Sequence, residues 1–146
     1  MKKGFTLLEL LIVIIIIGVL AVIALTQYRN LSERARLGEA KSVIGAIRTA
    51  ERIYHEDHSV FASDPVDLGA YINVPPSTVC ANTHWFRYTL AATGGTSFTV
   101  TATRCGSGGK TPNYTGTPLY AISLTEDEAG AQTKTSTFPG GSPTDW

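Results

Sequence analysis

The chain has 146 residues, with 12 Lys and Arg side chains against 12 Asp and Glu side chains and a formal net charge of +0 at pH 7. This balance excludes the strong basic excess by which nucleic-acid-binding domains attract phosphate, so a nucleic-acid partner is not indicated. The hydrophobic residues, 43% of the total, are unevenly distributed, because aliphatic side chains crowd the segment from Leu7 to Leu25.

The segment from Phe5 to Leu25 predicts a membrane-spanning helix. It contains one charged residue, Glu9, and its length matches the roughly 20 residues that cross a hydrocarbon core about 30 Å thick. Lys2 and Lys3 precede it, and basic residues beside a span stay on the cytoplasmic side. We therefore expect a cytoplasmic N-terminus, with the rest of the chain outside. A cleaved secretory signal is the alternative, but residues 24–27 offer a poor cleavage site.

Glu9 is unusual because a carboxylate among aliphatic side chains is costly in lipid, and such residues usually have a partner. One interpretation is that Glu9 lies near the membrane interface and reaches water at the lipid headgroups. The other is that its carboxylate pairs with a positive charge supplied by another chain.

Residues 4–9, Gly-Phe-Thr-Leu-Leu-Glu, followed by the apolar run, resemble the processing and assembly motif of type IV pilins and of the pseudopilins of type II secretion. The resemblance implies that a prepilin peptidase cuts between Gly4 and Phe5 and methylates the new amino group of Phe5. It also implies that Glu9 meets the terminal amine of a neighbouring subunit in the growing filament. The family usually has a proline where this chain has Thr26, so we expect a straighter helix there.

Residues 29–58 are predicted to continue the helix beyond the membrane and assembly segment, residues 5–28. Five residues recur at helical spacing and therefore share one face: Ala40, Val43, Ile47, Ala50 and Tyr54. A different face carries Arg34, Lys41, Arg48 and Arg52. This basic face is either solvated or paired with acidic patches of neighbouring subunits.

Residues 59–146 predict a loop, an antiparallel sheet and a C-terminal loop. One helical turn is expected between Val66 and Tyr71. Alternating apolar and polar residues predict three strands, with a Gly-Gly turn joining the first two, at residues 84–92, 97–104 and 119–124. The tail from Ala129, rich in Thr, Gly, Ser and Pro, predicts a surface loop. The predicted fold class is α+β, a long helix packed on a small antiparallel sheet of about three or more strands, which resembles the pilin fold.

Cys80 and Cys105 are predicted to form a disulfide. Cys80 precedes the first predicted strand and Cys105 follows the second, so antiparallel pairing brings their backbones near each other. Thiols outside the cytoplasm tend to oxidise. Two free buried cysteines are the alternative.

No pattern in the sequence predicts an enzyme, a cofactor or a metal site. His55 and His58 lie one helical turn apart, but a third ligand is missing nearby. The acidic run at residues 126–128 lacks the alternating spacing by which a loop wraps calcium. We therefore interpret the histidines as a polar helix end and assign no calcium site.

The predicted function is that of a structural subunit of a type IV pilus. The resemblance implies that residues 1–4 are a leader removed by prepilin peptidase, and that identical subunits form a helical homopolymer with the help of inner-membrane assembly machinery. The chain would span the inner membrane once, in contact with lipid, and then join an extracellular filament. The nearest alternative is a pseudopilin that forms a short periplasmic piston. A membrane-anchored binding module and an enzyme are more distant alternatives.

Overall fold

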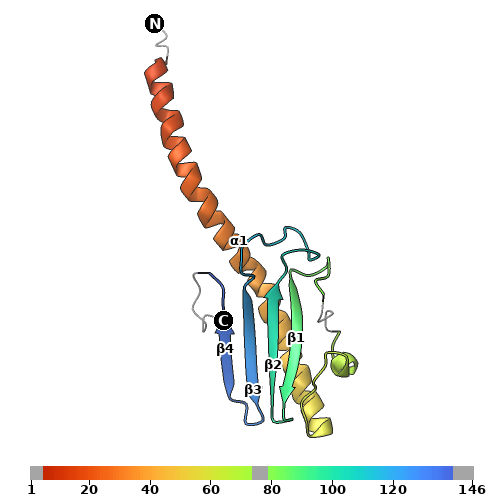
Figure 1. Ribbon diagram of the computed structural model, residues 1–146. Helices are drawn as coiled ribbons and strands as arrows, with labels where there is room; N and C mark the ends of the chain where they lie inside the picture. Colours follow the sequence, from red (N-terminus) through yellow and green to blue (C-terminus); the bar gives the residue numbers. More distant parts are fainter. Residues whose placement is uncertain (1–4, 74–78, 140–146) are drawn as a thin grey trace. The chain divides into compact units, whose positions relative to one another are not determined.

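The computed structural model describes residues 5–73 and 79–139 (Figure 1). Its elements, in chain order, are α1 (Leu7–His58), the 3-10 turn η1 (Asp67–Ala70), β1 (Phe86–Thr93), β2 (Ser97–Arg104), β3 (Ala121–Asp127) and β4 (Gln132–Ser136). The chain divides into two compact units, Met1–Leu37 and Gly38–Trp146, and α1 contributes residues to both. The predicted α+β class, with a long N-terminal helix and an antiparallel sheet, is confirmed.

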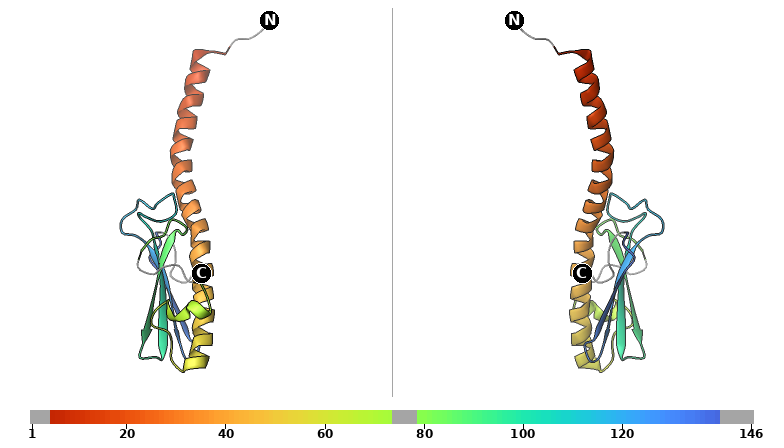
Figure 2. Two further views of the ribbon diagram at one scale, coloured as in Figure 1. Left: turned by 90° about the vertical axis from the view of Figure 1, so that its right-hand side faces the viewer. Right: turned by 90° about the vertical axis from the view of Figure 1, so that its left-hand side faces the viewer.

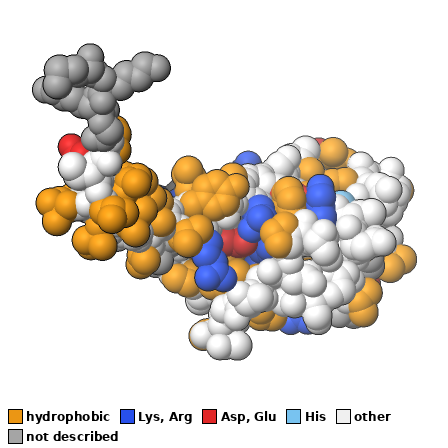
Figure 3. Space-filling view, turned by 90° about the horizontal axis from the view of Figure 1, so that it is seen from above, with side chains coloured by type: hydrophobic (Ala, Val, Ile, Leu, Met, Phe, Trp, Pro, Cys, Tyr) orange, Lys and Arg blue, Asp and Glu red, His pale blue; other side chains and the backbone are white. Residues whose placement is uncertain are grey.

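The described part of the first unit is dominated by the N-terminal part of α1. Every side chain from Phe5 to Leu25 is exposed, and Figure 3 shows apolar side chains crowded together on this part of the chain. By length and composition, α1 is a helix that could cross a membrane. The backbone is helical at position 26, but the side chain of Thr26 lies outside the described residues, so its expected effect on helix shape stays a prediction.

The second unit contains a four-stranded antiparallel sheet in the order β1-β2-β3-β4. The strand predicted at residues 97–104 is confirmed as β2, whereas β1 and β3 each begin two residues later than predicted. A tight turn joins β1 to β2, with the amide of Thr96 donating to the carbonyl of Thr93 at 3.2 Å. Gly94 and Gly95 have φ values of 61° and 76°, which glycine adopts at little cost and which mirror-image hairpin turns require.

The strand β4 was not predicted, because residues 129–146 were expected to form a surface loop. Its sequence, Gln-Thr-Lys-Thr-Ser, contains no apolar residue and therefore shows no alternation of apolar and polar side chains. It forms as an edge strand through backbone pairing with β3, in which Leu124 lies opposite Lys134. The expected loop is thus wrong for Gln132–Ser136, and residues 140–146 lie outside the described residues.

Within the second unit, the C-terminal part of α1 covers one face of the sheet (Figure 2). The buried helix positions are Ala40, Ile44, Ile47, Ala50 and Glu51. Val43 and Tyr54, which we predicted on this face, are only half-buried. Positions 40, 44, 47 and 51 also recur at helical spacing, so they share one face of the helix. The buried face is therefore rotated slightly about the helix axis relative to the predicted one.

The sheet completes this core with alternating inward side chains. The buried apolar strand residues are Phe86, Tyr88, Phe98, Val100, Ala102, Ile122 and Leu124, and Arg104 and Glu126 are buried beside them. Phe61 and Leu68 from the connection after α1 are also buried. The predicted helical turn between Val66 and Tyr71 is present as η1 and supplies Leu68 to the core.

Candidate functional site

The N-terminus of α1 is closed by reciprocal hydrogen bonds between Thr6 and Glu9. The backbone amide and the hydroxyl of Thr6 donate to Glu9 Oε2 at 2.9 and 3.0 Å, and the amide of Glu9 donates to Thr6 Oγ1 at 3.2 Å. This arrangement is a capping box, which satisfies backbone donors that have no partner inside the helix. Sequence reasoning missed Thr6, although the Thr-x-x-Glu spacing before an apolar run is a known signal for this motif.

The first described turn therefore gathers Phe5, Thr6 and Glu9 at an exposed helix end. The side chain of Phe5 is 77% exposed, and Glu9 Oε1 takes part in neither of the bonds from Thr6. Gly4 lies outside the described residues. Cleavage between Gly4 and Phe5 and the pairing of Glu9 with a neighbouring amine stay predictions.

Two members of the predicted basic face form an ion-pair cluster with Glu126 of β3. Arg52 Nε donates to Glu126 Oε1 at 2.6 Å, and Arg48 Nε donates to Glu126 Oε2. Gln132 Nε2 also donates to Glu126 Oε2, at 2.9 Å. Both side chains stay partly solvated, as one expectation for the basic face had it, but their carboxylate partner lies in the same chain and is fully buried.

Glu51 is a second buried carboxylate, and the sequence did not single it out. Its Oε2 accepts a hydrogen bond from the amide of Ala62 at 3.0 Å, whereas Oε1 has no hydrogen-bond partner among the described residues. Burial raises the pKa of Glu51 to about 7, although the bond from Ala62 acts in the opposite direction. The carboxyl group therefore changes its charge near neutral pH.

The two histidines at the end of α1 stack on separate aromatic rings. The ring of His55 lies 4.3 Å from that of Phe61, and the ring of His58 lies 4.1 Å from that of Tyr54. Among residues 5–73 and 79–139, no group of three or more His, Cys, Asp or Glu side chains is arranged to hold a metal ion. Each imidazole ring also has a polar neighbour, since His55 Nε2 lies 3.8 Å from Glu128 Oε1 and His58 Nδ1 lies 3.1 Å from the carbonyl oxygen of Tyr54.

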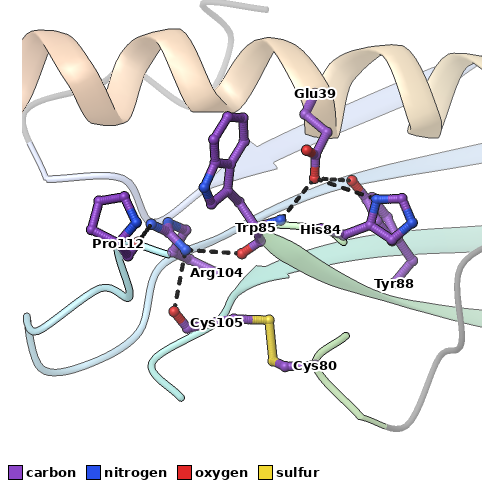
Figure 4. Close-up of a disulfide and its surroundings, with 8 residues drawn as sticks. All are labelled: Glu39, Cys80, His84, Trp85, Tyr88, Arg104, Cys105 and Pro112. Atoms are coloured by element: carbon purple, nitrogen blue, oxygen red, sulfur yellow. Dashed lines mark hydrogen bonds and ion pairs between the residues drawn. A yellow bond between two sulfur atoms is a disulfide. The ribbon is translucent and has the colours of Figure 1, made fainter. Parts of the chain in front are cut away.

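The predicted disulfide between Cys80 and Cys105 is present (Figure 4). Next to it, the fully buried Arg104 donates to three backbone carbonyls, those of Trp85 at 3.0 Å, Cys105 at 3.2 Å and Pro112 at 2.8 Å. The ammonium group of Lys110 lies 4.3 Å from the centroid of the Trp85 ring. The guanidinium of Arg104 therefore ties the start of β1 and the end of β2 to the loop that follows.

Glu39 of α1 contacts the same end of the sheet (Figure 4). Its Oε1 accepts a hydrogen bond from the backbone amide of Trp85 at 3.0 Å and one from the hydroxyl of Tyr88 at 3.5 Å. Burial, followed by the negative charge of Glu39, raises the pKa of Tyr88 above its usual range. The Tyr88 hydroxyl thus stays protonated and can donate to Glu39.

The exposed apolar helix with one capped carboxylate, and the antiparallel sheet covered by the C-terminal part of that helix, define a pilin-like α+β protein. Residues 1–25 match the family model described as the prokaryotic N-terminal methylation motif. The chain belongs to the family of type IV pilins and related proteins that carry this motif.

Three relatives illustrate the extent of the similarity. The fimbrial protein EcpC of Eikenella corrodens is 35% identical over 107 residues, which cover 73% of this chain and 65% of EcpC. The type IV major pilin protein PilE of Neisseria gonorrhoeae is 38% identical over 47% of this chain and 41% of PilE. The type IV major fimbrial protein FimA of Dichelobacter nodosus is 50% identical over 34% of this chain and 32% of FimA. The chain thus spans less than two thirds of the length of each of these relatives.

Proposed function

We propose that this chain is a structural subunit of a type IV pilus, made as a membrane-anchored precursor and assembled into a helical homopolymer. The observation that carries the proposal is the exposure of every side chain from Phe5 to Leu25, although nearly all of them are apolar. A surface of this kind is unfavourable in water. Lipid covers it before assembly, and the helices of identical subunits cover it in the filament. The role is structural and requires no catalysis by this chain.

Processing is the first step of the proposed mechanism. The chain inserts into the inner membrane with Lys2 and Lys3 on the cytoplasmic side. Prepilin peptidase then cuts between Gly4 and Phe5, and the new amino group of Phe5 is methylated. Cleavage places a positive charge on the residue before Thr6, at the end of α1 where the capping box lies.

Glu9 links processing to assembly. In the separate subunit, Thr6 donates two hydrogen bonds to the Glu9 carboxylate, so the charge is partly satisfied within one turn of the helix. When helices pack together, the carboxylate becomes buried, and an unpaired buried charge is costly. The terminal amine of a neighbouring Phe5 compensates this charge only in the correct axial position. The inner-membrane assembly machinery would move the subunits from lipid into an extracellular filament.

The processing step is tested by replacing Gly4 with Val, which places a branched side chain at the cleaved bond. Gly45→Val is the matched control, since a Cβ at Gly45 would meet nothing within 4 Å. Mass spectrometry should find the leader retained in Gly4→Val and a mature N-terminus at Phe5 in the control. A mature Phe5 N-terminus in Gly4→Val would contradict the proposed cleavage.

The assembly step is tested by Glu9→Gln, which removes the charge but keeps the size of the side chain. Glu56→Gln, at an exposed glutamate of the same helix, is the matched control. We expect normal insertion and cleavage for both variants, with filaments formed by the control and largely lost in Glu9→Gln. Normal filaments built from Glu9→Gln alone would overturn the role assigned to this carboxylate.

Deletion of the gene distinguishes the pilus from the secretion piston. Loss of surface fibres with normal export of secreted proteins supports the pilus. Unchanged surface fibres with secreted proteins trapped in the periplasm would instead identify a pseudopilin. Fibres sheared from wild-type cells should consist mainly of this chain, beginning at Phe5.

A further inference from the structure

The two cysteines of the disulfide lie in different surroundings. Cys105 directly follows β2 and is fully buried, with 0% of its surface exposed. Cys80 is half-buried and belongs to an irregular segment at the surface, in which Val79 is 60% exposed and Asn82 and Thr83 are also exposed. The bond between the two cysteines (Figure 4) therefore runs from the interior of the second unit towards its surface.

Two glycines in the loop after β2 pack against the disulfide, and they cover its two cysteines unequally. A Cβ placed on Gly109 would lie 2.5 Å from Cys105 Cβ and 3.1 Å from Cys105 Sγ. A Cβ placed on Gly108 would lie 3.4 Å from the carbonyl oxygen of Cys80 and 3.8 Å from its Cβ, with Cys80 Sγ more than 4 Å away. The main chain at Gly109 thus covers the sulfur of Cys105, whereas Gly108 leaves the sulfur of Cys80 uncovered on its side.

Backbone hydrogen bonds hold this covering loop in place. The amide of Lys110 donates to the carbonyl of His84 at 2.8 Å, and the amide of Tyr114 donates to the carbonyl of Cys105 at 3.1 Å. Because Lys110 follows Gly109 directly, the first bond fixes the position of the glycine. Moving the loop away from Cys105 would require these bonds to break, which is a local unfolding step with its own cost.

Thiol–disulfide exchange requires an attacking thiolate to reach one of the two sulfur atoms. The attacking sulfur forms a new bond to the sulfur that it reaches, and the other sulfur leaves as a thiolate. Access therefore decides which cysteine receives the incoming group. In the folded chain, the loop closes the approach to Cys105, so the half-buried Cys80 remains as the point of attack.

The guanidinium of Arg104 favours Cys105 as the sulfur that leaves (Figure 4). Arg104 is fully buried, and its Nη1 donates to the carbonyl of Cys105 at 3.2 Å. A positive charge near a cysteine favours the thiolate form, and a more stable leaving thiolate makes the exchange faster. Access and charge thus select the same direction of reaction.

We propose that Cys80 is the site at which this disulfide exchanges with thiols outside the chain, and that Cys105 is the leaving and resolving sulfur. In the reductive direction, an external thiolate bonds to Cys80 Sγ. The bond between the two cysteines breaks with both of its electrons on Cys105 Sγ, which then takes up a proton. This inference concerns the folded second unit and does not depend on assembly into a filament.

The same route in reverse describes how an external disulfide carrier would oxidise the folded chain. The Cys80 thiolate attacks the disulfide of the carrier, so that a mixed disulfide forms on Cys80 and one carrier sulfur leaves as a thiolate. The Cys105 thiolate then attacks Cys80 Sγ and expels the second carrier sulfur. Two electrons pass from the cysteine pair to the carrier, which departs as a dithiol.

The test uses the full oxidised chain in lipid nanodiscs, incubated with reduced glutathione. Acid stops the exchange, N-ethylmaleimide then marks each free thiol, and peptide mass spectrometry locates both groups. We expect glutathione on Cys80 with maleimide on Cys105, in about ten-fold excess over the reverse arrangement. The same reaction in guanidinium chloride should lose most of this preference, because unfolding exposes both sulfur atoms.

Gly109→Ala tests the cover over Cys105, since the new methyl group forces the loop to shift and should increase the modification of Cys105 by glutathione. Gly69→Ala is the matched control, because a Cβ there would meet nothing within 4 Å, and it should keep the wild-type preference. Thermal unfolding checks the fold of both variants, and the wild-type measurement stands without them.

Equal modification of the two cysteines in the folded wild type would overturn the proposal, as would a preference for Cys105 or the absence of any mixed disulfide. An unchanged preference for Cys80 in folded Gly109→Ala would contradict the role assigned to the glycine cover.

Discussion

Arg52 Nε lies 2.6 Å from Glu126 Oε1, an ion pair that joins α1 to β3 although the two residues are 74 positions apart in the sequence. Glu126 is fully buried, whereas both of its arginine partners keep part of their side chains in water. The cluster therefore neutralises a carboxylate inside the helix–sheet interface and connects it to solvent through two long cationic side chains. Such side chains bury their apolar stems while their charged ends stay hydrated.

Replacing Glu126 with Gln should destabilise the second unit. The substitution leaves Arg48 and Arg52 without their shared carboxylate, and we expect the free energy of unfolding to fall by about 1–3 kcal/mol. Partial exposure of both arginines makes this loss smaller than it would be for a fully buried pair. Glu128→Gln, at a side chain that is 51% exposed, is the matched control and should change the free energy of unfolding little. Chemical denaturation of the full chain in detergent measures both variants. Equal stability of the two variants would contradict the role of the cluster.

Glu51 should make the stability of the second unit depend on pH. The pKa of its carboxyl group is about 7 in the folded chain against 4.5 for an ordinary glutamate, so between these values the folded state binds more protons than the unfolded state. The free energy of unfolding contributed by Glu51 therefore rises as the pH falls from about 7 to 4.5, by at most about 3 kcal/mol.

Glu51→Gln isolates this contribution, because the amide stays neutral and its oxygen can still accept the hydrogen bond from Ala62. We expect the variant to be more stable than the wild type at pH 8, with the difference shrinking towards pH 5. Thermal unfolding of both proteins is measured at several pH values. Because both proteins contain the same histidines, the contribution of histidine titration cancels in the difference between them. A difference that does not vary with pH would show that Glu51 does not titrate in this range.

Thr6 should contribute to assembly through the capping box. Thr6→Val keeps the shape of the side chain but removes the hydroxyl, which costs a helix end about 1 kcal/mol and frees Glu9 from its bond to Thr6 Oγ1. We expect fewer filaments from Thr6→Val and a normal yield from Thr6→Ser, which restores the hydroxyl. Electron microscopy of sheared fibres, with immunoblots for processed subunit, measures the effect. An unchanged filament yield for Thr6→Val would remove Thr6 from the proposed assembly site.

Removing the disulfide should weaken the sheet. The double variant Cys80→Ser with Cys105→Ser opens a loop with a sequence separation of 25 residues. For a loop of this length, the chain-entropy relation gives a decrease of about 3 kcal/mol in the free energy of unfolding. Chemical denaturation of the full chain should show an earlier transition for the double variant. The wild type under reducing conditions should shift similarly, whereas the double variant should not respond to reductant.

The sequence was most informative where local periodicity determines structure. Strand β2 alternates strictly between polar residues and inward Phe98, Val100 and Ala102, and its bounds were predicted correctly. The cysteines could be paired because they flank the predicted hairpin. Thr6 was also accessible in principle, since a capping box is defined by spacing within a single turn.

The remaining features depend on contacts that local spacing does not encode. The bond from Arg48 to Glu126 spans 78 residues, and a basic helix face gives no indication of which carboxylate it will meet. Glu51 is polar and was therefore left outside the predicted apolar seam, although the helix buries it. Strand β4 forms because β3 offers an unpaired edge, and this is a property of the neighbouring strand, not of its own sequence.

The position of the disulfide limits how far the oxidised chain can be stretched. The bond between Cys80 and Cys105 encloses all of β1, β2 and their turn. If the chain is pulled from its ends, the enclosed residues add almost nothing to its contour length, even after the hairpin has separated. A span of 25 residues would reach roughly 80–90 Å when fully extended. Oxidation therefore shortens the maximal extension of each subunit by about that distance.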